Sequence, residues 1–360
     1  MAERSVRELP STTTANLAAI ERRAKSTPHI FNWIGFILGS LRTPARYPAP
    51  RYTDHEDLRL TRIIKRSTKA RRGGVNVVGF PFDGAVLGRR GAAGGPTAIR
   101  EAMSAFSNYN VELGVSLKGA HVFDLGDLVV DQSNTIASHM RIESEVAEDI
   151  DPESLLLVLG GDNSVSLPCI RAASKGLGEL GLVVIDSHLD LRGEIDGKPT
   201  SGSSYGLAVK TLKGLDPHRV VEVGMHGFLN SKDYYEKAKR LGITVVTARE
   251  VWEKGPEAVA QLAYAKASRG AEAVYLSVDL DAVDLAYVSG VSAPSAGGIS
   301  ADQLFRMVYE ISRKDKVKCA DVVELAPLLD PSGRSARVAA AAVTYIIAGY
   351  VARSSQAARN

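Results

Sequence analysis

The stretch Gly181-Leu-Val-Val-Ile-Asp-Ser-His-Leu-Asp-Leu-Arg192 decides the fold of this chain and the place of its chemistry. Its apolar part, Leu182–Ile185, is rich in β-branched side chains, as expected of a strand buried on both faces of a sheet. Asp186, His188 and Asp190 follow at once, and alternate side chains of an extended chain share one face. Two carboxylates and an imidazole at a buried strand end are costly without a cation between them. The stretch therefore predicts a site for Mn, Fe, Ni or Zn; the alternative is a solvated loop.

A second stretch of the chain has the same character. The apolar run Ala273–Val278 is followed by Asp279, Asp281 and Asp284. Asp279 and Asp281 again share one face of an extended end, and Asp284 lies just beyond them. Two buried strands that both end in alternating carboxylates favour a metal site over a solvated loop. With four carboxylates and one histidine, the two strand ends can hold two ions about 3.5–4 Å apart, as in two-metal hydrolases.

Short apolar runs alternate with amphipathic stretches from residue 75 onward. This alternation is typical of a mainly parallel sheet with helices on both faces, so the predicted fold class is α/β. Ligands of such sheets bind beyond the carboxyl ends of the strands, where the carboxylates above are predicted to lie. The predicted strands are 75–80, 122–125, 155–159, 182–185, 220–224, 243–246, 273–278 and 317–323. The predicted helices are 97–106, 134–150, one ending near residue 175, 232–241, 256–268, 300–312 and 335–352.

Two further polar residues follow predicted strands. Glu324 comes after the last strand and is predicted to face a substrate; the alternative is a Glu that caps a helix or forms a salt bridge. His226 follows a middle strand in a Gly-rich loop, where a structural histidine is the favoured interpretation. Gly160-Gly161 lacks both the Gly-Lys-Ser/Thr of a P-loop and the third glycine of a dinucleotide-binding loop, which argues against nucleotide binding.

Composition is that of a soluble globular protein, because 45% of the 360 residues are hydrophobic and 24% are charged. No apolar run was identified that reaches about 18 residues, so we expect no membrane-spanning helix. We also expect no signal peptide. Cys169 and Cys319 are isolated in apolar surroundings, which predicts buried thiols in a cytoplasmic protein rather than a disulfide.

Positive charge is concentrated at the start of the chain. Residues 1–72 hold 15 Lys and Arg against 6 Asp and Glu, and they are predicted to form a basic N-terminal extension and linker before a catalytic domain at 73–360. The extension is expected to contain helices at 12–25 and 29–41 and a Pro-rich linker at 44–50. A basic arm can bind nucleic acid or membrane. It lacks repeated Lys/Arg blocks and a recognition-helix pattern, so an oligomer-docking or solvated extension is favoured.

Four motifs together resemble the ureohydrolase superfamily of arginase, agmatinase and formimidoylglutamase. Asp186-Ser-His-Leu-Asp190 resembles its Asp-Ala-His-x-Asp, and Ser277-Val-Asp-Leu-Asp-Ala-Val-Asp284 resembles its Ser-x-Asp-x-Asp-x-x-Asp. Val323-Glu-Leu-Ala-Pro327 is similar to Glu-x-Asn-Pro, and Gly91-Ala-Ala-Gly-Gly-Pro-Thr-Ala-Ile-Arg100 to its Gly-rich entry loop. The resemblance covers about residues 73–355 in order, and it implies a three-layer αβα sandwich with a mainly parallel central sheet.

Within the superfamily, three details resemble formimidoylglutamase. Gly290-Val-Ser-Ala-Pro294 is similar to the segment of that enzyme where other members have a Gly-Thr-Gly-Thr-Pro type. Asp190-Leu-Arg192 extends the metal motif as in that enzyme. Thr200-Ser-Gly202 resembles its substrate loop, where arginases and agmatinases carry a His-Gly pair; no histidine occurs between His188 and His218.

The resemblance also implies two Mn²⁺ ions per chain, with Ni²⁺ as an alternative metal. One ion would be held by Asn163, Asp186, Asp190 and Asp279, and the other by His188, Asp186, Asp279 and Asp281. Asn163 stands where the family has the His of Gly-Gly-Asp-His-Ser. An amide oxygen is a weaker ligand than imidazole, so the first ion is expected to bind less tightly than the second.

The reaction implied is hydrolysis of N-formimidoyl-L-glutamate to L-glutamate and formamide. Asp190 is expected to accept a water proton, Glu324 to orient the amidinium, and Asp284 to belong to the catalytic group. Arg192 and Ser201, with Gly202 beside them, are expected to receive the substrate carboxylates.

Two alternatives stay open from the sequence. One is an agmatinase or guanidino-acid amidinohydrolase that releases urea, and the other is a catalytically silent homologue with an assembly or regulatory role. The expected partners are a small amidine or guanidine and further copies of this chain, as a trimer or hexamer. Neither nucleic acid nor a membrane is expected as a partner.

Overall fold

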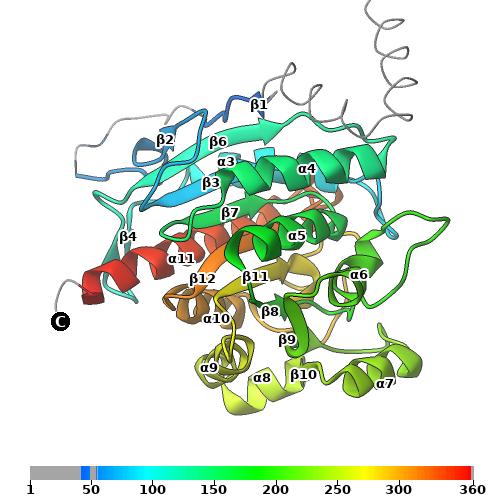
Figure 1. Cartoon of the computed structure of the whole chain (residues 1–360). Coiled ribbons are helices and arrows are strands. Elements are labelled where there is room, and N and C mark those ends of the chain that lie inside the picture. Colours follow the sequence, from blue (N-terminus) through cyan, green and yellow to red (C-terminus); the bar gives the residue numbers. More distant parts are fainter. Residues whose placement is uncertain (1–41, 49–53, 55, 358–360) are drawn as a thin grey trace, which may run out of the picture. The chain divides into compact units, whose positions relative to one another are not determined.

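The structure is a computed structural model that describes residues 42–48, 54 and 56–357. Its compact unit begins at Arg42, and Figure 1 shows the order of its elements. The predicted helices at 12–25 and 29–41 lie outside the described residues.

A 10-stranded sheet forms the centre of this unit, in the order β1-β6-β3-β7-β12-β11-β8-β9-β10 with β2 also paired to β6. Its pairs are parallel except β1 with β6, which is antiparallel. Its strands are β1 (Arg42–Thr43), β2 (Lys65–Arg66), β3 (Val75–Gly79), β6 (Val122–Leu128), β7 (Leu155–Leu159), β8 (Leu180–Ile185), β9 (Leu215–Met225), β10 (Thr244–Thr247), β11 (Ala273–Asp279) and β12 (Val317–Val323). A separate hairpin joins β4 (Tyr109–Asn110) to β5 (Val115–Ser116).

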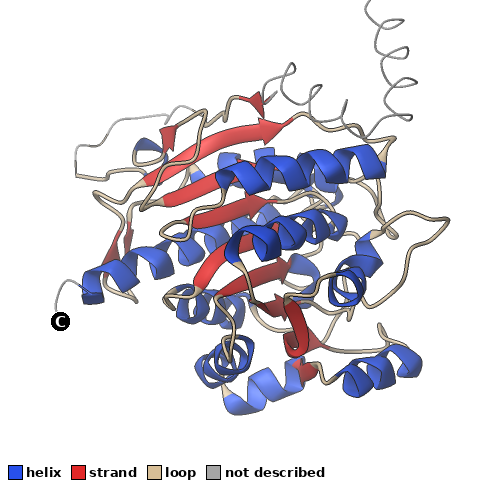
Figure 2. Ribbon diagram, in the orientation of Figure 1, coloured by secondary structure: helices blue, strands red, loops and turns tan. Residues whose placement is uncertain are grey.

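Helices cover both faces of the sheet (Figure 2). Alternate residues of each central strand enter two separate hydrophobic cores, one on each face, as the uninterrupted apolar runs predicted. One core includes α3 (Gly95–Met103), α8 (Ala248–Lys254), α9 (Pro256–Ala267), α10 (Ala301–Ser312) and α11 (Arg334–Ala357). The other includes α4 (Thr135–Asp149), α5 (Ser166–Leu177), α6 (Ser204–Thr211) and α7 (Lys232–Leu241). The predicted three-layer αβα sandwich is confirmed.

Short 3₁₀ turns lie in the loops that connect these elements. The described turns are η1 (Leu60–Arg62), η2 (Ala92–Gly94), η3 (Asn163–Val165), η4 (Ser201–Ser203), η5 (Leu280–Ala282) and η6 (Pro327–Leu329). Five of them, η2 to η6, lie in loops that follow the carboxyl ends of β3, β7, β8, β11 and β12, where the predicted site residues are.

Two helices were missing from the sequence prediction, α6 and α8. Helix α8 begins with a capping box, in which the Thr247 side chain accepts from the Glu250 amide and the Glu250 carboxylate accepts from the Thr247 amide. The Thr-x-x-Glu spacing is the sequence signal for such a start. Helix α6 follows the turn η4 and is mostly buried, so its eight residues show little amphipathic contrast.

Residues between 42 and 72, predicted to be extension and linker, contribute to the sheet. Strand β1 pairs with β6, and the Tyr47 hydroxyl donates to Asp124 Oδ2 at 2.5 Å. The Arg42 guanidinium donates to Glu145 and Asp149 of α4, at 2.9 and 2.5 Å, with all three side chains largely buried. The compact unit therefore extends N-terminal of residue 73.

Helix α11 is the longest in the described chain. By length and composition alone, its segment Arg334–Arg353 could cross a membrane, and 56% of that segment is buried. Its buried residues belong to the same core as α3 and α10. A core position therefore accounts for the apolar character of this helix, which the sequence analysis did not single out.

Candidate metal centre and active site

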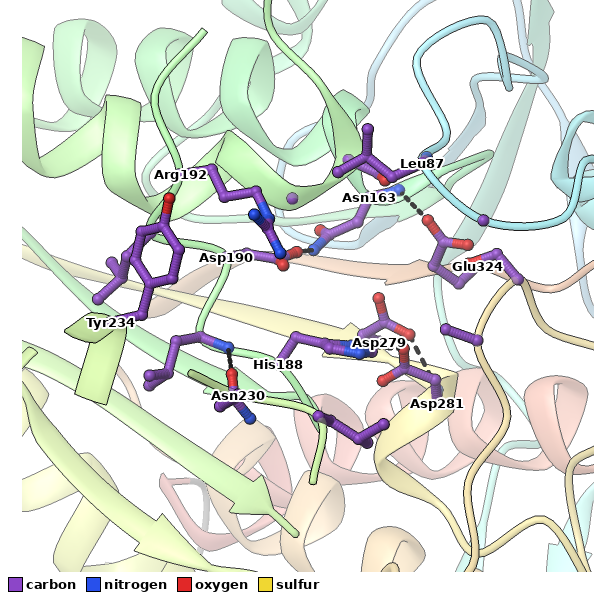
Figure 3. Close-up of a pocket in the computed structure, with 18 of the residues that line it drawn as sticks. Leu87, Asn163, His188, Asp190, Arg192, Asn230, Tyr234, Asp279, Asp281 and Glu324 are labelled. Atoms are coloured by element: carbon purple, nitrogen blue, oxygen red, sulfur yellow. Dashed lines mark hydrogen bonds and ion pairs between the residues drawn. The ribbon is translucent and has the colours of Figure 1, made fainter. Parts of the chain in front are cut away.

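Three adjacent strands bring the predicted site residues together. Strands β8, β11 and β12 run parallel and side by side, so their carboxyl ends share one edge of the sheet. Each of these ends carries carboxylates that line one pocket of about 180 Å³ (Figure 3). The predicted residues in its lining are Asn163, His188, Asp190, Arg192, Ser201, Gly202, Asp279, Asp281 and Glu324.

Asp186, His188 and Asp281 form a compact cluster. Their candidate ligand atoms all lie within 4.8 Å of one another. His188 Nδ1 is 2.9 Å from Asp281 Oδ2 and 3.6 Å from Asp186 Oδ1, and the two carboxylates are buried. Ser187 fixes Asp281 by donating its amide and hydroxyl to Asp281 Oδ1, at 3.2 and 2.7 Å. The predicted convergence of the two strand ends is thus observed.

Electrostatics make this cluster a place for a cation. Burial, and then the charge of Asp281, raises the pKa of Asp186 well above its ordinary value. Burial and the same neighbour raise the pKa of Asp279. Burial disfavours charged His188, yet hydrogen bonds to Asp186 and Asp281 outweigh it and raise its pKa to about 12. The two carboxylates thus favour a positive charge at this position. A divalent ion fits the same oxygen and nitrogen donors.

Asp190 is the second acid of the loop that follows β8. Its backbone has a positive φ of 45°, uncommon for a residue other than glycine. The Asp190 carbonyl accepts a hydrogen bond from the Gly206 amide, and this bond links the loop to α6. Burial raises the pKa of its carboxyl group to about 7. Asp190 Oδ2 accepts a 2.5 Å hydrogen bond from Asn163 Nδ2.

Asn163, which the resemblance matches to the family's histidine, lies at the start of η3. Its Nδ2 points to Asp190 and, at 3.4 Å, to Asp186 Oδ2. Its Oδ1 accepts from the Tyr205 hydroxyl at 3.0 Å and the Ser166 hydroxyl at 3.1 Å. Ligation of an ion through Oδ1 therefore requires the amide to turn over. The sequence reasoning missed Tyr205 and Ser166, because contacts between buried polar side chains on separate elements leave no local pattern.

Glu324 lies across the pocket from the β8 loop (Figure 3). It too has a positive φ, of 70°, and its side chain is buried. Oε1 accepts from the Asn163 amide at 2.7 Å, and Oε2 has no hydrogen-bond partner among the described residues. Burial, and then the charge of Asp162, raises the pKa of Glu324 to about 8. Oε1 thus caps the first turn of η3, as the helix-capping alternative held, while the unpaired Oε2 suits a cationic ligand.

The other side of the pocket carries Arg192, Ser201 and Gly202. The Arg192 guanidinium lies over the Tyr234 ring, 5.3 Å from its centroid. The Arg192 amide donates to the Gly202 carbonyl at 3.1 Å, and Ser201 Oγ accepts from the Leu87 amide at 3.1 Å. Among the described lining residues, Arg192 is the one Lys or Arg side chain. This part of the pocket therefore suits an anionic group.

Comparison with known proteins identifies the family. The sequence profile of the arginase family matches residues 74–349. This chain belongs to the arginase family. It is 31% identical to a formimidoylglutamase of Halalkalibacterium halodurans over 78% of this chain and 88% of the relative. It is 32% identical to an agmatinase of Bacillus subtilis over 76% of this chain and 90% of the relative.

Solved structures of the same family have the same fold. The formimidoylglutamase of Bacillus subtilis superposes with a TM-score of 0.78 at 26% identity, covering 84% of this chain and 95% of that one. The Trypanosoma cruzi formiminoglutamase with Mn²⁺ gives a TM-score of 0.75 at 28% identity, covering 82% of this chain and 99% of that one. The predicted resemblance to the ureohydrolase superfamily is therefore confirmed.

Two candidates of the sequence analysis lie elsewhere in this arginase-family chain. Asp284 is absent from the described pocket lining; its Oδ1 and Oδ2 accept from the amides of Ala286 and Gly297, at 2.8 and 2.6 Å. These bonds stabilise the loop after η5, and the catalytic role of Asp284 stays a prediction. His226 lines a neighbouring cavity, and its Nδ1 lies 2.8 Å from the Gly224 carbonyl oxygen. The structural interpretation of His226 agrees with this contact.

Proposed function

We propose that this chain is a metal-dependent hydrolase of a linear amidine, with N-formimidoyl-L-glutamate as its substrate and L-glutamate and formamide as products. One observation carries the proposal: the site combines the Asp186–His188–Asp281 cluster, a carboxylate oxygen of Glu324 that has no hydrogen-bond partner among the described residues, and the guanidinium of Arg192. The cluster is complementary to a metal ion, Glu324 to an amidinium, and Arg192 to a carboxylate.

The donor set fits divalent manganese. We infer that the two ions of the family would be held by Asn163, Asp186, Asp190 and Asp279, and by His188, Asp186, Asp279 and Asp281. When bound, the metal supplies a water whose pKa is lowered, and so a nucleophile near neutral pH. The Mn²⁺-containing Trypanosoma cruzi relative supports this choice of metal. Two ions per chain and Ni²⁺ as an alternative stay proposals.

The side chains of this chain divide the remaining work. Asp190 Oδ2 accepts the proton of the attacking water and passes it to the leaving nitrogen, a role suited to a carboxyl group whose pKa is raised to about 7. Asn163 Nδ2 holds that carboxylate at 2.5 Å until the amide turns over to offer Oδ1 to the ion. Glu324 Oε2 accepts from the amidinium N–H groups and orients the carbon to be attacked. Arg192 binds a carboxylate of the substrate, with Ser201 beside it.

The sign of the charge at Arg192 separates this proposal from the nearest alternative. An agmatinase must bind a cationic tail, for which Glu194 and Asp196 offered acids in the sequence. Both are exposed and neither belongs to the described lining of the pocket, whereas Arg192 does. The agmatinase relative keeps a urea-releasing amidinohydrolase as the second candidate. A catalytically silent homologue is disfavoured by the intact acid and histidine cluster.

Product analysis tests the substrate. Protein reconstituted with Mn²⁺ is incubated separately with formimidoylglutamate, agmatine, arginine and guanidinobutyrate, and formamide, glutamate and urea are measured. We expect formamide and glutamate in equal amounts from the first and no urea above background from the others. Urea from a guanidine, without formamide from formimidoylglutamate, would show that the substrate assignment is wrong while the family assignment stands. Turnover of none by metal-loaded protein would favour the silent homologue.

Substitution of Asn163 by His is expected to strengthen retention of one metal ion. Imidazole is the better ligand for Mn, Ni and Zn, and the wild-type amide must first leave its hydrogen bonds to Tyr205 and Ser166. Even outer-sphere changes alter metal affinity by about 10–100-fold, so a change of a ligand should be measurable. Metal content is followed during dialysis, with wild type expected to lose one ion readily and Asn163→His to keep both. Equal retention by the two proteins would exclude Asn163 from the weak site.

The remaining expectations concern the oligomeric state, the cellular location and the partners of the protein. We propose a homo-oligomer, trimer or hexamer, in the cytoplasm, with no nucleic acid or membrane partner and with the basic N-terminal segment in a docking role. Phe228 and Trp252 support assembly, because they are large apolar side chains that are more than half exposed. Sedimentation of the full chain tests the subunit number.

A further inference from the structure

Asn230 contacts the backbone on both sides of His188. It lies in the loop between β9 and α7 and lines the same pocket (Figure 3). Its Oδ1 accepts from the Leu189 amide at 2.9 Å, and its Nδ2 donates to the Ser187 carbonyl at 2.8 Å. One side-chain amide thus binds the residue before His188 and the residue after it.

These two bonds supply what the secondary structure does not. Strand β8 ends at Ile185, so no strand ladder fixes the backbone of residues 187–189. The amides of Ser187 and His188 donate to Asp281 and Asp186, which are themselves members of the cluster. Within the described residues, Asn230 is the side chain from outside the cluster that fixes this segment at two points. Asn230 thereby anchors residues 187–189 to the loop that follows β9, the strand next to β8.

The orientation of His188 follows from this anchoring. The imidazole leaves a backbone that is held at both neighbours, with Nδ1 directed to Asp281 and Asp186 at 2.9 and 3.6 Å. A freely rotating backbone would let the ring turn towards the open pocket, since the His188 side chain is 25% exposed. An asparagine suits this task because its planar amide offers an acceptor and a donor side by side.

We propose that Asn230 is a positioning residue that aims His188 at the metal site, an inference that rests on the metal-dependent function proposed above. Asn230 acts through the loop backbone and touches neither metal nor substrate in this role. Groups that orient a metal-binding histidine typically change metal affinity by about 10–100-fold when removed. We expect a loss of that size for Asn230→Ala, concentrated on the ion that His188 binds.

A matched control is present in the same chain. Asn76 Oδ1 accepts from the Arg71 amide at 2.8 Å, and its Nδ2 donates to the Arg71 carbonyl at 2.9 Å. It therefore makes the same two kinds of bond to a loop backbone, but on β3 and outside the pocket lining. Asn76→Ala removes equivalent hydrogen bonds without changing the site. It is expected to lower the melting temperature and leave metal affinity unchanged.

The experiment measures Mn²⁺ affinity by chelator competition in full-length wild type, Asn230→Ala, Asn230→Asp and Asn76→Ala, together with the melting temperature of each metal-free protein. Asn230→Asp keeps the acceptor for Leu189 and the shape of the side chain but loses the donor to Ser187, so it provides a folded variant if Asn230→Ala is unstable. We expect weaker Mn²⁺ binding in both Asn230 variants. We also expect their kcat to fall more than their KM rises.

Each outcome decides between the inference and its premise. If folded Asn230 variants bind Mn²⁺ as tightly as wild type, Asn230 does not position His188. If Asn76→Ala weakens Mn²⁺ binding as much as the Asn230 variants do, the effect is general destabilisation and the inference is equally overturned. If wild type itself binds no Mn²⁺, the proposed function fails, and the inference fails with it.

Discussion

Substitution of Asp281 by Asn is expected to remove metal binding and activity together. The Asp281 carboxylate is buried, contacts His188 Nδ1 at 2.9 Å and accepts from Ser187. The amide has the same shape but no charge, so it removes a candidate ligand and the ionic partner of His188. Loss of one partner of a buried charged pair costs about 3–5 kcal/mol, and a loss of metal binding of the same size would be roughly 150- to 4,000-fold. Metal content and formamide release of the purified variant are the measurements.

Asp284→Asn is the control for this change. Asp284 is three residues further on in the same motif and also makes two hydrogen bonds through its carboxylate, but to loop amides away from the pocket. This variant is expected to melt at a lower temperature and to keep its metal and kcat. If Asp284→Asn abolishes metal binding as Asp281→Asn does, loop structure rather than ligation explains both effects. A metal-replete Asp281→Asn protein would contradict the assignment of Asp281.

Substitution of Glu324 by Gln is expected to reduce kcat/KM by about 30- to 4,000-fold while metal content stays unchanged. The proposed substrate cation pairs with a buried carboxylate, and truncating one partner of such a pair costs about 2–5 kcal/mol. Gln keeps the acceptor for the Asn163 amide at 2.7 Å, so the backbone at Asn163 stays in place. What is lost is the charge opposite the amidinium.

Kinetics and metal analysis of the same Glu324→Gln preparation separate two roles. If Glu324 orients the substrate, the variant binds Mn²⁺ like wild type and loses turnover. If Glu324 instead supports the metal site through Asn163, metal content falls in step with activity. Retention of full kcat/KM would remove Glu324 from the proposed mechanism.

The sheet and the main acids of the site were predictable because they depend on strong local patterns. The apolar runs ending at Ile185 and Val278 are long, rich in β-branched residues and followed at once by carboxylates. Parallel strands must present those ends at one edge, and Asp186, His188 and Asp281 do meet there. The remaining ligand assignments, such as Asn163, came from the family resemblance rather than from the pattern itself.

What the sequence could not indicate depends on contacts between distant loops. Asn230 binds the backbone of residues 187 and 189. Because every residue has these backbone groups, the sequence carries no sign of the contact. Tyr205 reaches Asn163 from helix α6, which was itself missing from the prediction. Asp284 shared the spacing of the metal motif, yet the chain turns at η5 and directs it to loop amides instead. Side chains alternate between the two faces only within a strand. Asp284 lies beyond the end of β11, so alternation could not predict its direction.

The N-terminal boundary shows the same limit. The Pro-rich composition after residue 43 indicated a linker, but two-residue strands such as β1 and β2 are too short for any periodic signal. Their placement rests on partners far along the chain, including the bonds from Arg42 to α4 and from Tyr47 to Asp124.

The most direct test of the account is a titration of metal-free protein with Mn²⁺, in which bound metal and formamide released from formimidoylglutamate are measured on the same samples. The account predicts no turnover without metal, activity that rises with the metal bound per chain, and a plateau when the His188 and Asn163 sites are both filled. Hydrolysis that proceeds unchanged in chelator-treated protein would contradict it, as would Mn²⁺-saturated protein that releases no formamide.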